Sequence, residues 1–123
     1  MWMAQSNQNA LASREIESID VGVSLNFNPA VHQTVISVRG AFTQTLRPQF
    51  FKAIMAVPDS VIELVIDLSE TVELDASAMG MLILLHDRYP GSESIIVLAP
   101  NSPIEQFLRT ANFHQLFAFE TAV

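Results

Sequence analysis

The chain of 123 residues contains no cysteine, few glycines and few basic residues. Without cysteine it can form no disulfide, no thiolate nucleophile and no cysteine-ligated zinc site. Its four glycines do not form a G-x-x-x-x-G-K phosphate-binding loop. The six lysines and arginines are scattered from Arg14 to Arg109 and the net charge is −7, which argues against non-specific binding to nucleic acid.

The sequence also lacks a long hydrophobic run. The longest apolar stretches are well short of the roughly 20 residues that span a bilayer, and the N-terminus has neither a basic region nor a continuous apolar segment typical of a secretory signal. Half of the residues are hydrophobic and 15% are charged, so a folded core is expected rather than disorder. We therefore expect one soluble, cytoplasmic domain with no membrane insertion.

The first third of the chain predicts a polar arm followed by a hairpin. Residues 1–19 are interpreted as a flexible N-terminal arm with room for a helical turn over 11–19, and residues 20–123 as the domain. Apolar and polar residues alternate over 21–27 and again over 31–39, which is typical of half-buried strands. Asn28-Pro29-Ala30 between them is a turn signal, and Gly40 ends the second strand.

The rest of the chain alternates between helical and strand patterns. Residues 46–57 have apolar residues at helical spacing, and the apolar run 61–66 predicts a strand covered on both faces. A helix that starts at or near Ser77 and contains the apolar run Met81 to Leu85, a strand over 94–99, a helix from Pro103 capped by Asn101 or Ser102, and a strand over 116–119 follow. The resulting order, β-β-α-β-α-β-α-β, predicts an α/β fold with helices packed on a mixed sheet of four to five strands, parallel where helices cross over.

The stretch from Asp67 to Gly80 is the main functional candidate. A strand ends at Asp67, a short polar loop of residues 69–71 follows, and Asp75-Ala76-Ser77 begins an apolar helix. A helix start has free N–H groups and a partial positive charge, so a phosphate on Ser77 would be tolerated there and would change the surface charge. The alternative is that Asp75 or Ser77 is an ordinary helix cap.

These residues make the sequence resemble the STAS domain of bacterial anti-sigma factor antagonists. The resemblance covers about residues 20–120 and rests on the element order, on the apolar strand ending in Asp67-Leu68-Ser69 and on the Asp75, Ser77 and Gly80 pattern. It implies that Ser77 occupies the position of the serine phosphorylated in that family. Ala76 and Ala78 depart from the family's Asp-Ser-Ser-Gly loop, and Ala78 narrows the backbone freedom that glycine would allow.

The resemblance also implies partners. They are an anti-sigma factor that is a serine kinase of the histidine-kinase ATPase fold and a PP2C-type phosphatase, in a partner-switching pathway that regulates transcription. The alternative is a constitutive, non-phosphorylated STAS subunit of a larger complex, such as a transporter ATPase assembly. The residues expected to contact a partner are Asp75, Ala76, Ser77, Ala78, Met79, Met81 and Leu82.

Other chemistry is not expected from this sequence. A triad of Ser77, His86 and Asp87 lacks the G-x-S-x-G elbow, and adjacent residues point to different faces of a helix. The carboxylates of Glu70, Glu73 and Asp75 form an acidic rim but lack EF-hand spacing. We therefore expect a non-enzymatic protein without cofactor or metal, and leave open whether Ser69 or Thr71 competes with Ser77 as phosphate acceptor.

Overall fold

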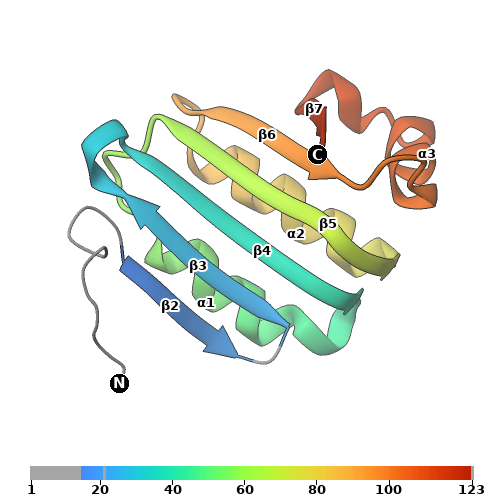
Figure 1. Ribbon diagram of the computed structural model, residues 1–123, viewed down its shortest axis with the longest axis horizontal. Helices are drawn as coiled ribbons and strands as arrows, with labels where there is room; N and C mark the ends of the chain where they lie inside the picture. The colour runs from blue at the N-terminus through green and yellow to red at the C-terminus, as the bar shows by residue number, and fades with distance from the viewer. Residues whose placement is uncertain (1–14, 21, 123) are drawn as a thin grey trace.

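The computed structural model describes residues 15–20 and 22–122, and in that part the chain forms one six-stranded sheet of order β2-β3-β4-β5-β6-β7 (Figure 1). The strands β2 (Glu15–Asp20), β3 (Val23–Asn28) and β4 (Gln33–Phe42) form an antiparallel meander. The strands β5 (Glu63–Leu74), β6 (Glu93–Leu98) and β7 (Ala118–Thr121) then continue the sheet parallel to β4. The predicted α/β class, mixed sheet and element order are confirmed.

The parallel strands are joined by helices that all lie on one face of the sheet. In the described chain these are α1 (Arg47–Ala56), α2 (Ala76–Arg88) and α3 (Pro103–Thr110), with short 3-10 turns at Pro29–Val31, Gln44–Leu46 and Phe113–Gln115. Buried residues of all three helices belong to one hydrophobic cluster with the strands. Figure 1 is seen from the other side, with α1 and α2 behind the sheet. The molecule therefore has two layers, helices on one side and strands on the other.

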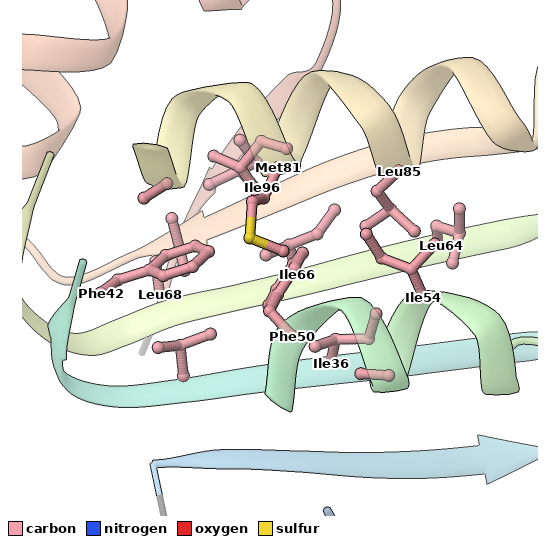
Figure 2. Packing of buried hydrophobic residues seen from close by; sticks show 14 of the residues in the cluster. Ile36, Phe42, Phe50, Ile54, Leu64, Ile66, Leu68, Met81, Leu85 and Ile96 are labelled. Atoms are coloured by element: carbon pink, nitrogen blue, oxygen red, sulfur yellow. The ribbon is translucent and has the colours of Figure 1, made fainter. Parts of the chain in front are cut away.

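Alternate residues of each central strand point toward the helices and form the core (Figure 2). In β5 these are Leu64, Ile66 and Leu68, each at most 1% exposed. The rings of Phe42 and Phe50 pack with their centroids 4.8 Å apart, which fixes α1 against the end of β4. At the opposite end of the helices, the buried Tyr89 hydroxyl donates to the Ile54 and Val57 carbonyl oxygens, which ties the end of α2 to the end of α1.

The other face of the sheet is not covered by any helix that the structure describes. Its side chains in β4, β5 and β6, such as Val35, Val65 and Val97, are partly exposed. The expectation that the strand over 61–66 is covered on both faces is therefore wrong. The apolar run did not reveal this, because Ile62 is 58% exposed before the strand begins and Val65 is partly exposed on the face that no described helix covers.

Residues 15–20 form a strand instead of part of an arm. They pair antiparallel with β3 through a tight turn at Gly22, whose φ of +90° suits glycine. The edge of β3 supplies hydrogen-bonding partners for residues 15–20, so these residues form a strand despite their polar composition. The sheet therefore has one strand more than expected. The interpretation of residues 1–14 as a flexible arm lies outside the described residues.

Residues 69–71, expected as a loop, lie within β5. Strand β4 runs two residues past Gly40, so Arg39, Gly40 and Phe42 pair with Glu70, Thr71 and Leu74. The Thr71 hydroxyl is buried and donates to the Val38 carbonyl oxygen at 2.8 Å. Register shifts in this part of the β4–β5 pair are typical of bulges, which allow polar residues to continue a strand.

The C-terminal elements follow the prediction with small shifts. Ser102 is the cap of α3, with its hydroxyl accepting from the Ile104 amide at 3.1 Å, and Pro103 is the first helical residue. The last strand begins at Ala118 instead of residue 116, because the 3-10 turn Phe113–Gln115 precedes it and the rings of Phe113 and Phe117 stack at 5.9 Å in the core. These shifts do not alter the topology.

Candidate functional site

Asp75 organises the junction between β5 and α2. It is the N-cap of α2, and its side chain accepts from the Ala78 amide at 2.9 Å. Its second carboxylate oxygen accepts from the Gln44 amide at 3.0 Å, and its own amide donates to the Phe42 carbonyl oxygen. One carboxylate thus satisfies two backbone amides and connects the start of α2 to the turn that leads into α1.

Ser77 is the second residue of α2. Since Asp75 already supplies the cap, the Ser77 hydroxyl is not required for that purpose. The side chain is partly exposed and opens onto a groove between α1 and α2. The groove is lined by Gln44, Arg47, Pro48, Phe51, Ser77, Gly80, Met81 and Leu84. The start of α2 therefore presents a free hydroxyl beside a largely apolar depression.

The apolar walls of this groove are unusually exposed for large side chains. Phe51 of α1 is 48% exposed and Leu84 of α2 is 44% exposed, and the nearby Met55 on α1 is 48% exposed. Gly80 is exposed, and a side chain built at that position would meet nothing within 4 Å. Exposed apolar side chains grouped around a depression are typical of a protein-binding surface.

The charge beside Ser77 differs from the expected acidic rim. Arg47 lines the same groove as Ser77, while Glu70 lies with Arg39 and Asp67 in a hollow on the open face of the sheet. Glu70 and Ser77 are therefore on opposite sides of the sheet, and the expectation that Glu70 borders Ser77 is wrong. The register shift between Asp67 and Glu70 is the reason, because a bulge interrupts the strict alternation of β5 and places Glu70 on the same face as Asp67.

Comparison with known proteins identifies the family. No family model matches the sequence. A STAS-domain-containing protein of Pseudomonas aeruginosa is 36% identical over 86 residues, which cover 69% of this chain and 85% of that protein. This chain belongs to the STAS-domain family.

Solved structures share the STAS fold with it. A sulfate transporter family protein from Wolinella succinogenes superposes with a TM-score of 0.58 at 13% identity, over 74% of this chain and 79% of that one. The anti-sigma factor antagonist SpoIIAA in its unphosphorylated form gives a TM-score of 0.53 at 15% identity, over 89% of both chains. At these identities the likeness establishes the fold.

Within this STAS domain, the residues expected to contact a partner fall into two groups. Asp75 and Ser77 are partly exposed and Ala76 is exposed. Ala78 and Leu82 are at most 1% exposed and pack in the core, Met81 is 5% exposed, and Met79 is partly buried against the same cluster. Figure 2 shows Met81 and Leu85 pointing from α2 into the space between helices and sheet. Ala78 and Leu82 are therefore not part of the surface that a partner can reach.

Sequence reasoning missed Phe51 and Met55 of α1, because the apolar pattern of a helix does not say which apolar side chain lacks a neighbour. In α2 the apolar run from Ala78 to Leu85 is wider than one buried stripe, and this excess predicts an exposed apolar side suited to a protein partner unless a neighbouring helix covers it. Its exposed members prove to be Ile83 and Leu84.

The structure also bears on the other candidate groups. His86 contacts Asp87 at 3.4 Å, but it lies nine positions after Ser77 in α2, about 13 Å along the helix axis, so no Ser-His-Asp triad is assembled. Thr71 is buried, and Ser69 donates to the Asp67 carboxylate at 2.6 Å on the open face.

Across residues 15–20 and 22–122, no cluster of three or more His, Asp or Glu side chains suits a metal ion. No helix in that part is long and apolar enough to cross a bilayer.

Proposed function

We propose that this STAS domain is a non-enzymatic regulatory binding protein of the anti-sigma factor antagonist type, acting in the cytoplasm and switched by reversible phosphorylation of Ser77. The observation that carries the proposal is the free, partly exposed hydroxyl of Ser77 beside the groove between α1 and α2. The proposed partners are an anti-sigma factor that is also a serine kinase of the histidine-kinase ATPase fold, and a PP2C-type phosphatase. Together they would form a partner-switching pathway that controls transcription.

The proposed contact surface consists of residues from both helices. It comprises Asp75, Ala76, Ser77, Gly80 and Leu84 from the start and outer side of α2, with Arg47, Pro48 and Phe51 from α1 and the buried Met81 in the lining of the groove, whereas Met79 packs against the core outside this lining. Exposed apolar side chains around a central depression favour burial by a protein. Ser77 lies at the edge of this surface, where an added group would enter the interface.

Phosphorylation would act through charge. A phosphoserine at position 77 adds about −1.5 to −2 charges at neutral pH and stays compatible with the helix start. A partner that buries the groove must desolvate this charge or pair it, and the lost binding energy corresponds to a change in affinity of about 100-fold. Unmodified Ser77 is the binding-competent state for one partner.

The first test is mass spectrometry of the protein isolated from its own cells under several growth conditions. We expect a species heavier by about 80 Da, the mass of an added HPO₃ group, with the modified peptide containing Ser77. A Ser77→Ala variant should lack this species and a Ser69→Ala variant should keep it. Unmodified protein under every condition, or a phosphate on Ser69, would contradict the proposal.

The second test measures affinity for a kinase of the proposed class encoded beside this gene. We expect the phosphorylated protein and Ser77→Asp to bind about 100-fold more weakly than Ser77→Ala. Ser69→Ala, which removes a hydroxyl from the opposite side of the sheet, should bind like the unmodified protein. Equal affinities of the phosphorylated protein and Ser77→Ala would rule out the switch.

The second candidate function is a constitutive, non-phosphorylated subunit of a larger complex, such as a transporter ATPase assembly. Ala78 favours it, because a methyl group buried to 1% exposure in the core occupies the position where the family's loop has a flexible glycine. Such a subunit would use the same groove without modification. It predicts an unmodified protein in cells and a partner whose affinity is unchanged by Ser77→Ala.

A further inference from the structure

The open face of the sheet carries an apolar row that the core does not explain. Register aligns Val35, Val65, Ile95 and Ala118 across β4, β5, β6 and β7. Ile95 is only 6% exposed but does not belong to the core cluster, so its neighbours on the open face bury it. Val35 and Val65 are partly exposed and Ala118 is exposed. We call these four residues the apolar row.

Carboxylates lie on both sides of the apolar row. On one side, Glu63 of β5 and Glu93 of β6 occupy paired positions. On the other side, Asp67 and Glu120 are aligned on either side of Val97. Among the lysines and arginines of the described chain, Arg39 alone lies on this face, in a hollow that also contains Asp67 and Glu70. The open face is therefore acidic with an apolar centre.

The pairing of Glu63 with Glu93 has an electrostatic cost. Like charges at directly opposed positions of neighbouring strands destabilise a sheet. Gln33 donates a hydrogen bond to Glu63, but neither glutamate forms an ion pair within residues 22–122. No basic side chain of the described chain thus compensates this repulsion. Cations supplied by another molecule would relieve it.

We propose that the open face is a docking surface for an amphipathic helix of a partner protein, with apolar residues on one side and lysine or arginine residues flanking them. Neighbouring strands are about 4.8 Å apart and one helical turn rises about 5.4 Å. A helix lying across the strands therefore places one apolar side chain per turn near each residue of the apolar row. Its flanking cations face Glu63 and Glu93 on one side and Asp67 and Glu120 on the other.

This surface is separate from the groove beside Ser77, because the sheet lies between them (Figure 1). The docking of a basic helix therefore does not depend on phosphorylation. The domain would hold one protein on its helical layer and a second on its open face. This docking surface is additional to the proposed phosphorylation switch, and it does not depend on that switch.

The experiment uses a synthetic helical peptide as the probe and isotope-labelled full-length protein as the target. The peptide has about three turns, with leucine at i, i+4, i+7 and i+11 and lysine at the flanking positions. We expect its addition to shift the amide NMR signals of the apolar row, and a peptide with glutamate in place of lysine to leave them unchanged. Shifts that map to the α1–α2 groove, or no shifts at all, would overturn the proposal.

A matched pair of variants tests the role of charge. We expect Glu63→Gln with Glu93→Gln to weaken the leucine–lysine peptide about tenfold. The control, Asp87→Asn with Glu105→Gln, changes the net charge equally on the helical layer, and its affinity should stay within about twofold. Equal losses in both variants would show attraction to net charge alone and would refute a defined surface. The first variant should melt no lower than the unmodified protein, because it removes a repulsion, so weaker binding would not reflect unfolding.

Discussion

The two faces of the same sheet carry different kinds of residues. The face toward the helices is mostly apolar, with Thr34 and Ser94 as buried polar exceptions, and its central side chains, such as Ile36, Ile66 and Ile96, are completely buried. The open face mixes valines with serines and carboxylates, and most of its side chains are partly exposed. The face covered by the helices stabilises the domain. The α1–α2 groove and the open face are both outer surfaces, so they can differ in charge and can bind different partners.

The largest expected effect is a difference in the free energy of unfolding between two substitutions on opposite faces of β5. Ile66→Ala removes a fully buried side chain and should lower the free energy of unfolding by about 2–5 kcal/mol, because a cavity remains in the core. Val65→Ala, one residue earlier on the open face, should cost less than about 1.5 kcal/mol. Urea unfolding of both variants measures the difference. Equal losses would mean that the open face is packed as tightly as the core.

A medium effect is expected at the start of α2. Asp75→Ala leaves the amides of Ala78 and Gln44 without their carboxylate acceptor and should cost about 1–2 kcal/mol. Asp75→Asn retains an acceptor for the helix cap and should recover most of this loss. Thermal unfolding measures both variants. If Asp75→Ala were as stable as the unmodified protein, the carboxylate would not connect α1 to α2.

The smallest effect concerns the open face and has the opposite sign. Glu93→Gln removes one of two opposed carboxylates and should raise the free energy of unfolding by about 0.2–1 kcal/mol at low salt. The gain should disappear in about 1 M salt, where charges more than a few ångströms apart are screened. Unfolding at both salt concentrations is the measurement. A loss of stability at low salt would show that Glu93 forms a favourable contact instead.

Much of the α/β fold was predictable because it depends on local patterns. Alternation over 21–27 and 31–39 marked the hairpin, and Ser102-Pro103 marked the start of α3 through the chemistry of its cap. Ser77 was placed correctly at a helix start, because the Asp75 cap and the apolar helix after it are read from neighbouring residues. Such signals operate over a few residues and need no tertiary partner.

Other features could not be read from local patterns. Residues 15–20 and 69–71 look polar, but each becomes a strand because a neighbouring strand offers hydrogen bonds, β3 in the first case and the end of β4 in the second. The identity of the groove residues Arg47, Phe51 and Leu84 likewise depends on how α1 and α2 lie against each other. Hydrophobicity alone does not tell which apolar side chains remain exposed.

The sequence by itself determined the order of the elements, the helix caps and the position of Ser77, because these follow from side-chain periodicity and backbone chemistry within short segments. Only the tertiary structure decided which face of the sheet is covered, which charge lies beside Ser77, and that Glu63 opposes Glu93. These properties arise where segments 30 or more residues apart in the chain meet, and burial and electrostatic energy depend on those neighbours in space.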